Sequence, residues 1–192
     1  MAKAFISLLK EEEYSKVTVT KITEKANVNR GTFYKHYTYK EDILKEVQSG
    51  VLNRLTEIIE TNYVHIPIDQ ISDDQLDTTL FEFVYEYREF FHLAINTSIF
   101  PNFQKEFCTK IEAILMGQYF SLLDLPEKTK PVLCRYIAYG FFGILVSWDA
   151  DDYSGSVEEA AETTHRVLLH DFTELQKRSL ALQNSHSAAS SD

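Results

Sequence analysis

The segment from Arg30 to His36 collects side chains that can bind phosphates and the edges of nucleic-acid bases. It contains two cations, a hydroxyl, a phenol and an imidazole within the seven residues RGTFYKH. Such groups make hydrogen bonds to phosphate oxygens and to base edges. Phe33 and Tyr37 are four residues apart and are predicted to face inward, which leaves the polar groups on the other sides of a helix. Gly31 has no side chain, so another surface can approach its backbone closely.

Local signals place this segment on the second of two short helices joined by a tight turn. Thr18 is a typical N-cap for the first helix, because its hydroxyl can accept a hydrogen bond from a free backbone N–H. Residues 27–29, Asn-Val-Asn, end that helix, since asparagine tolerates turn conformations and bonds its own backbone. Asn29 then caps the second helix. A valine precedes each cap and is predicted to form a hydrophobic staple with a residue inside the helix.

A third motif helix is predicted to begin directly after these two. Thr38 caps it, and Glu41, three residues later, completes a capping box. Lys40 lies beside the free N–H groups of this helix start, which suit an anion such as a DNA phosphate. An amphipathic helix over about residues 2–13 is expected to pack over the two motif helices and to complete a three-helix domain.

The same stretch carries a recognisable order of residues: TVTKIT at 18–23, VNRGTFYKHY at 28–37, and then Lys40, Glu41 and Leu44. This order resembles the N-terminal signature of the TetR family of bacterial transcriptional regulators. Three positions depart from the family pattern, with Thr23 in place of alanine, Asn27 in place of glycine and Tyr37 in place of phenylalanine. Asparagine can adopt the left-handed conformation that glycine favours, so DNA binding is still expected.

The resemblance implies a dimer that places two recognition helices in successive major grooves of a near-palindromic operator. It favours a repressor over an activator, released from DNA by a small-molecule effector that binds in the rest of the chain. We expect DNA contacts from the start of the first motif helix, from the second helix and from the start of the third. The residues concerned are Thr18, Thr20, Lys21, Arg30, Gly31, Thr32, Tyr34, Lys35, His36 and Lys40.

The distribution of charge separates this interpretation from an alternative of another class, a protein-interaction module that acts through a partner regulator. The whole chain of 192 residues has a net charge of −10, which taken alone argues against nucleic acid. From residue 14 to residue 40, however, six cations stand against the single carboxylate of Glu24, which leaves +5. A basic patch confined to the motif is expected of a protein that binds DNA there and nowhere else. An interaction module would not need it.

The remainder of the chain is predicted to be helical, which gives an all-α fold of about nine helices without a convincing strand. We expect a helix-turn-helix domain over residues 1–48, a regulatory and dimerisation domain over 49–180 and a disordered Ser/Ala-rich tail over 181–192. A long helix from Tyr39 to about Asn62 connects the two domains. Gly50 inside it allows either a modest bend or close packing against a neighbour.

The body shows a second, looser resemblance, to the C-terminal domain type of TetR-like regulators of Gram-positive bacteria. It rests on FVYEY at 83–87 before FF at 90–91, and on YGFFGI at 139–144 before Trp148. Aromatic residues at helical spacing usually fill a core. They also line apolar ligand cavities, where tyrosine hydroxyls supply the few polar groups that such a site needs. Under this second interpretation the ligand-binding residues are Phe83, Tyr87, Phe91, Phe103, Phe107 and Tyr119.

The helix predicted from about residue 127 to residue 149 is apolar on more of its circumference than one core contact needs. A helix that is apolar all round must be covered all round. We therefore predict a homodimer in which this helix and the last one, residues 156–180, form a four-helix bundle with their mates. The predicted interface residues are Tyr139, Gly140, Gly143, Ile144, Trp148, Ala161, Thr164 and Leu168.

Other chemistries find little support in the sequence. No nucleophile–base–acid arrangement has a local signature and no Gly-rich phosphate loop is present, so we predict a protein that is not an enzyme and needs no cofactor. His165 and His170 are five residues apart, a poor spacing for metal ligands on one helix face. Cys108 and Cys134 are predicted to be buried free thiols of a cytoplasmic protein. No signal peptide or membrane span is expected, since the apolar stretch 136–148 is too short to cross a bilayer.

Overall fold

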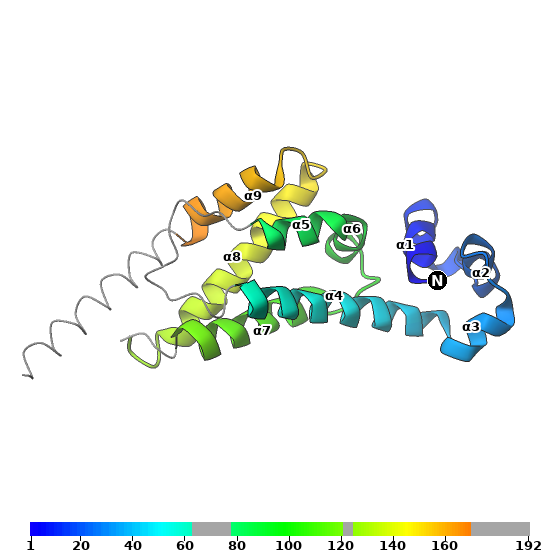
Figure 1. Cartoon of the computed structure of the whole chain (residues 1–192), viewed down its shortest axis with the longest axis horizontal. Coiled ribbons are helices and arrows are strands. Elements are labelled where there is room, and N and C mark those ends of the chain that lie inside the picture. The colour runs from blue at the N-terminus through cyan, green and yellow to red at the C-terminus, as the bar shows by residue number, and fades with distance from the viewer. Residues whose placement is uncertain (63–77, 121–124, 170–192) are drawn as a thin grey trace, which may run out of the picture.

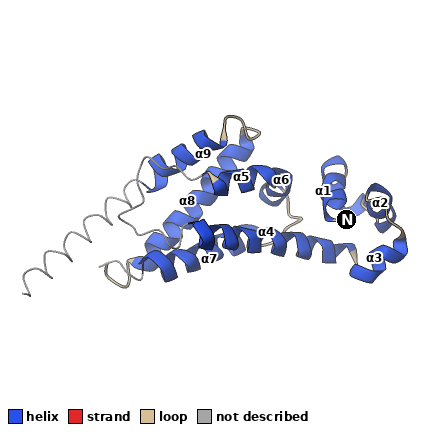
Figure 2. Cartoon of the chain, in the orientation of Figure 1, coloured by secondary structure: helices blue, strands red, loops and turns tan. Residues whose placement is uncertain are grey.

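The structure, a computed structural model, describes residues 1–62, 78–120 and 125–169, apart from the side chains of residues 118, 119 and 169. Within these ranges the chain forms nine α-helices and no strand (Figure 2), which confirms the predicted all-α fold. The helices are α1 (Ala2–Glu11), α2 (Val19–Lys25), α3 (Arg30–His36), α4 (Lys40–Asn62), α5 (Thr79–Glu86), α6 (Arg88–Asn96), α7 (Phe103–Ile114), α8 (Lys130–Ala150) and α9 (Val157–Thr164). A 3-10 turn, Tyr14–Lys16, precedes α2, and π-helical turns continue α7 (Leu115–Tyr119) and α9 (His165–Leu169).

Helix α4 connects two groups of helices (Figure 1). Its start lies beside α1, α2 and α3, which we call the N-terminal unit. Its second half lies among α5–α9, which we call the body. Ile43 is buried near the start of α4, and Leu55 and Ile58 are buried further along. One continuous helix therefore contributes to the cores of both groups.

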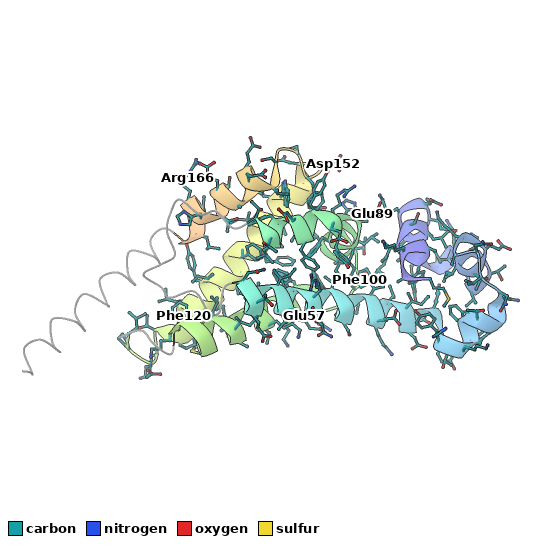
Figure 3. The ribbon with its side chains drawn as sticks, viewed as in Figure 1. Glu57, Glu89, Phe100, Phe120, Asp152 and Arg166 are labelled. Atoms are coloured by element: carbon teal, nitrogen blue, oxygen red, sulfur yellow. The ribbon has the colours of Figure 1, made fainter. Side chains whose placement is uncertain are left out.

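The N-terminal unit is built around a small apolar core. Phe5 of α1, Ile22 of α2 and Phe33 of α3 each have an exposed fraction of 0%. Helices α2 and α3 have only seven residues each, a length at which an isolated helix is not stable in water. Their stability must come from packing on α1 and from their caps. Helix α1 also contacts the body, where Lys10 donates a hydrogen bond to Glu89 of α6 at 2.9 Å. Figure 3 labels Glu89, at the end of the body that lies towards α1.

Phenylalanine rings form the centre of the body. Phe91, Phe103 and Phe107 are completely or almost completely buried. The ring centroid of Phe107 on α7 lies 6.0 Å from that of Phe141 and 5.5 Å from that of Phe142, both on α8. Offset and edge-to-face pairs at such distances are favourable and add to the burial of apolar surface. Helices α7 and α8 are thus joined mainly by aromatic packing.

Two helices change to π-helical turns within the described residues. Helix α7 begins at Phe103 and changes to a π-helical turn at Leu115. Gly117 lies in this turn, where it lowers the helix propensity. The last helix, expected over residues 156–180, is α-helical from Val157 to Thr164 and then changes to the second π-helical turn. Its predicted end, and every other expectation for residues 170–192, lie outside the described residues.

Two expectations about long helices also need correction. Helix α4 continues through Gly50, and a Cβ added there would meet no atom within 4 Å, so close packing of this glycine on a described residue is excluded. Helix α8 has 21 residues and is, among the described helices, the one long and apolar enough to cross a membrane, although no such run was expected. Of its most apolar window, 39% is buried inside the molecule. Core helices share this length and composition, so the finding alone does not indicate a membrane span.

Candidate DNA-binding surface

Two side-chain caps fix the geometry of the helix-turn-helix. At the start of α2, the Thr18 hydroxyl accepts a hydrogen bond from the Lys21 backbone N–H at 3.3 Å. At the start of α3, the Asn29 side-chain oxygen accepts from the Thr32 N–H at 2.7 Å. Between the helices, Asn27 has a φ of 53°, the left-handed conformation predicted for this turn. Both predicted N-caps are confirmed.

Helix α3 is buried on one side and exposed on the others. Phe33 is fully buried, and its ring centroid lies 5.2 Å from that of Tyr34 and 5.4 Å from that of Tyr37. Tyr37 is buried as well and donates from its hydroxyl to Glu46 at 3.0 Å. Burial, together with this carboxylate, raises the pKa of Tyr37. The residues of α3 predicted to face DNA are half-buried (Thr32) or exposed (Arg30, Gly31, Tyr34, Lys35 and His36).

The end of α1 supplies carboxylates that pair with the lysines of α2. The ammonium of Lys21 lies 2.5 Å from the Glu12 carboxylate, and that of Lys25 lies 2.5 Å from Glu11. The hydrogen bond and charge of Lys25 lower the pKa of Glu11. The sequence count of positive charge missed these pairs, because the glutamates at 11–13 precede the motif. Lys21, predicted to contact DNA, is therefore already paired within the chain.

Lys40 is also engaged within the chain. Its ammonium donates hydrogen bonds to the backbone carbonyls of Tyr14 at 2.7 Å and Val17 at 2.9 Å. The same nitrogen lies 3.9 Å from the centroid of the Tyr14 ring. The Tyr14 hydroxyl donates to Glu41 at 2.5 Å, which lowers the pKa of the Glu41 carboxyl. A phosphate contact by Lys40 stays a prediction, since its ammonium binds the turn before α2.

Helix α4 is capped by a carboxylate of its own first turn. The backbone N–H groups of Thr38 and Tyr39 donate to Asp42 Oδ2 at 2.9 and 2.8 Å. These two bonds lower the pKa of the Asp42 carboxyl. The predicted capping box between Thr38 and Glu41 is wrong, because Asp42 reaches the free N–H groups and Glu41 turns to Tyr14. The N–H groups of Thr38 and Tyr39, directly before the helix, are therefore already bonded within the chain.

One further residue of this surface was not predicted from the sequence. Tyr39 has an exposed fraction of 66% and lies between α3 and α4. An exposed tyrosine beside a cationic helix can donate to phosphate oxygens. Its spacing gave no signal, because Tyr39 lies four residues before the buried Ile43 and would share its face if the helix began earlier.

Two family models match this chain. Residues 3–47 match the model described as bacterial regulatory proteins, tetR family, and residues 74–170 match the model described as transcriptional regulator C-terminal region. The chain belongs to the TetR family of bacterial transcriptional regulators. The first match covers α1–α3 and the start of α4, so the surface described above is the helix-turn-helix part of a TetR-family DNA-binding regulator.

Individual relatives agree with this assignment. The uncharacterized HTH-type transcriptional regulator YxbF of Bacillus subtilis (strain 168) is 25% identical over 162 residues, which make up 83% of this chain. They make up 41% of that relative, so the chain spans about two fifths of its length. The dihydroxyacetone kinase operon activator DhaS has the same fold, with a TM-score of 0.65 and 23% identity over 88% of this chain and 92% of its own. A Clostridium perfringens protein, provisionally named a fatty acid metabolism regulator, has a TM-score of 0.62 and 25% identity over 87% of this chain and 95% of its own.

In this TetR-family regulator, the rings predicted to line a ligand cavity pack against one another. The Phe91 centroid lies 6.2 Å from that of Phe83, 5.8 Å from Phe103 and 6.4 Å from Phe107. Tyr87 is partly exposed, and the side chain of Tyr119 lies outside the described part. An open hollow of about 710 Å³ lies elsewhere, between the first half of α4 and the connection from α6 to α7. The rings therefore fill a core in this conformation, and a cavity among them stays a prediction.

The residues predicted for the dimer interface fall into two groups. Tyr139 and Gly143 are exposed and Ile144 is half-buried on α8. Four others, Trp148, Ala161, Thr164 and Leu168, are buried by their own chain. Gly140 faces Leu168, whose Cδ1 would lie 2.6 Å from an added Cβ. Sequence reasoning missed Val132, Tyr136 and Val146, which are exposed on the same helix. The apolar pattern did not reveal which side of α8 its own chain covers.

The other titratable side chains considered in the sequence make structural contacts. Among the described residues, no three histidine, cysteine, aspartate or glutamate side chains are grouped as metal ligands. His92 Nδ1 lies 3.0 Å from the buried carboxylate of Asp149, which also accepts from Asn96 at 2.6 Å. Cys108 and Cys134 are buried free thiols, as predicted, and burial raises the pKa of each to about 11.

Proposed function

We propose that this TetR-family regulator binds a near-palindromic operator as a homodimer and represses transcription until a small-molecule effector releases it. The observation that carries this proposal is the exposed polar surface of α3 around the buried Phe33. A symmetric operator needs two copies of α3, held at half-sites about 34–36 Å apart or a multiple of that distance. The same proposal assigns residues 1–48 to DNA binding and 49–180 to regulation, in a cytoplasmic protein.

Within each half-site we assign two kinds of contact. Arg30 and Thr32 lie at the N-terminal end of α3, the part of a recognition helix that contacts base edges. Tyr34, Lys35 and His36 follow and are exposed, so we assign them to phosphates. Among the described residues, Arg30 and Lys35 form no ion pair, in contrast to Lys21, which is bound to Glu12.

An exposed apolar stripe on α8 supports the homodimer. Val132, Tyr136, Tyr139, Gly143 and Val146 are all exposed and follow one another at steps of three and four residues. This spacing puts them on one face of the helix. Contiguous apolar surface of this kind marks an interface more often than a solvated face. Because the two copies of a symmetric dimer present the same surface, the stripe would meet its own image.

We assign the effector to the aromatic cluster of the body, where a ligand would have to displace ring contacts and replace them with its own. One similar solved structure is provisionally named a fatty acid metabolism regulator, which makes an acyl chain the first class of effector to test. Another is named an operon activator, so a reporter gene under the operator is needed to establish the sign of regulation.

The direct test is the binding of labelled DNA from upstream of the protein's own gene, measured by fluorescence anisotropy. Wild-type protein should bind this DNA more tightly than a scrambled duplex. Arg30→Ala should weaken operator binding by about 1–3 kcal/mol per half-site and relax base preference at one position of each. Lys105→Ala is the matched control, because it removes one exposed cation from α7 in the body. Equal affinity of the wild type for operator and scrambled duplex would contradict the proposal and favour an interaction module.

A further inference from the structure

The ammonium of Lys40 has partners on most of its sides. A lysine ammonium has three N–H donors and no acceptor. Two donors are used by the carbonyls of Tyr14 and Val17, at 2.7 and 2.9 Å. The Tyr14 ring, whose centroid lies 3.9 Å from the nitrogen, covers a further side and attracts the positive charge. Lys35 on α3 differs, because it is exposed and has no ion-pair partner among the described residues.

The neighbours of Lys40 also oppose an incoming phosphate. The next two residues are Glu41 and Asp42, and both carry a lowered carboxyl pKa and so stay ionised at neutral pH. Like charges a few ångströms apart repel each other. The N–H groups of Thr38 and Tyr39, directly before α4, already donate to Asp42. A phosphate beside Lys40 would have to approach the two carboxylates of Glu41 and Asp42.

The two bonded carbonyls lie at the boundary that sets the position of the helix-turn-helix. Tyr14 begins the 3-10 turn, and Val17 directly precedes Thr18, the N-cap of α2. Lys40 is the first residue of α4, which follows α3 (Figure 1). The lysine therefore joins the chain just before α2 to the chain just after α3. Both ends of the motif are held by this one side chain.

We propose that Lys40 is a positioning residue and does not bind a DNA phosphate. It holds the Tyr14–Val17 turn against the start of α4 and thereby determines the position of α3. The proposal rests on operator binding by α3. A phosphate ligand contributes equally to every DNA sequence, because phosphates carry no sequence information. A positioning residue contributes mainly to the operator, because only the operator requires α3 to be placed accurately.

The first experiment is a salt titration of operator binding with wild-type protein, Lys40→Met and Lys35→Ala. Methionine keeps an unbranched apolar stem and removes the donors. Lys35→Ala should lower the slope of log K against log salt by about 1 per half-site, as expected for a lost phosphate contact. Lys40→Met should leave the slope unchanged, weaken operator binding roughly tenfold or more and lower the ratio of operator to scrambled-duplex affinity. A slope lowered by about 1 per half-site with that ratio unchanged would overturn the proposal.

The second experiment needs no DNA. Hydrogen exchange of the backbone amides of residues 14–18 should become faster in Lys40→Met and should not change in Lys35→Ala. Unchanged exchange in both variants would overturn the positioning role.

Tyr14→Leu keeps Lys40 and its charge but removes the ring, so it should weaken operator binding with an unchanged slope of log K against log salt. This variant tests the proposal even if Lys40→Met fails to fold. Normal operator binding by Tyr14→Leu would count against the proposal. If the wild type shows no operator preference, the proposed function fails, whereas the exchange experiment still tests Lys40.

Discussion

Helices α2 and α3 have seven residues each and begin at side-chain caps, whereas α7 and α8 have 12 and 21 residues and meet through phenylalanine rings. In the N-terminal unit, polar contacts such as the Asn29 cap and the Lys40 bonds determine where the short helices lie. In the body, apolar area determines how the helices pack. Hydrogen bonds depend on direction and act only over short distances, whereas apolar packing has no preferred direction. The difference teaches that the DNA-binding surface depends, beside its small apolar core, on a few hydrogen bonds, each of which can be removed by one substitution.

The largest effect should follow from removing a fully buried ring from the core of the N-terminal unit. Phe33→Ala replaces a fully buried side chain and should destabilise this unit by about 3–5 kcal/mol, through lost burial and the cavity left behind. Operator binding should disappear, while the body stays folded. The thiols of Cys108 and Cys134 report on the body separately, because both are buried and have a pKa raised to about 11. They should react slowly with a thiol reagent in both wild type and variant.

The control for this prediction is Tyr34→Ala, since Tyr34 is exposed on the same helix. It should weaken DNA binding without changing the unfolding temperature. Fast thiol reaction in Phe33→Ala would show that the N-terminal unit and the body unfold together, which would contradict separate stabilisation of the two regions.

The next largest effect concerns the exposed stripe of α8. Gly143 is exposed, and a Cβ added there meets no atom within 4 Å, so Gly143→Arg should fold normally. In a symmetric dimer it would bring two arginines together, and like charges juxtaposed at an interface cost several kcal/mol. The dimer dissociation constant should rise by on the order of a hundredfold, as measured by sedimentation velocity.

Gly50→Arg is the matched control for this substitution. Gly50 is also an exposed glycine within a helix, with no atom within 4 Å of an added Cβ, but it lies on α4. This variant should sediment like the wild type. A monomeric wild type at micromolar concentration would contradict the dimer, and with it the two-fold operator.

A smaller effect should follow from loss of the α3 cap. Asn29→Ala removes the side-chain oxygen that accepts from the Thr32 N–H and should cost about 1 kcal/mol, as other lost N-caps do. The unfolding temperature should fall by roughly 2–4 °C. Asn53→Ala, at an exposed site on α4, serves as the control and should be neutral or slightly stabilising, because alanine is the better helix former.

The smallest effect should depend on pH. Hydrogen bonds from two backbone N–H groups hold the pKa of Asp42 below its ordinary value of 3.8. A carboxyl whose pKa is lowered on folding stabilises the folded state at pH values above its unfolded pKa, and this contribution is lost as the pH falls through the folded pKa. Asp42→Ala should therefore be less stable than wild type by a constant amount between pH 5 and pH 8. The difference should shrink below about pH 4, and a difference that persists unchanged in acid would contradict the assigned cap.

The comparison also explains which features could be predicted from the sequence. The caps at Thr18 and Asn29 are signalled by residues within four positions, so α2, α3 and the turn between them could be placed in advance. The capping box at Thr38 could not, because Glu41 is bound by Tyr14, 27 residues earlier in the chain. The same holds for Lys40, whose partner carbonyls lie 26 and 23 residues away. Contacts between distant residues leave no local pattern.

In the body, the apolar pattern predicted helices but not what covers them. Trp148 and Leu168 were assigned to a dimer interface, yet the rings of Phe81 and Tyr153 cover Trp148 within one chain. A hydrophobic position has the same signature whether its neighbour comes from the same chain or from another copy. For the same reason, the sequence allowed the aromatic residues between Leu80 and Phe120 to be assigned either to a core or to a ligand cavity. Only the ring contacts in the structure distinguish a core from a cavity.

The ion pairs between the end of α1 and the lysines of α2 bear on how a regulator finds its site in a cell. Binding to arbitrary DNA is almost entirely electrostatic and grows with each cation available to phosphates. Glu11 and Glu12 withdraw Lys25 and Lys21 from that pool, which lowers affinity for the roughly 10⁶–10⁹ competing sites of a genome. Under the proposed function, fewer copies would then be held at irrelevant positions, and fewer molecules would be needed to keep an operator occupied.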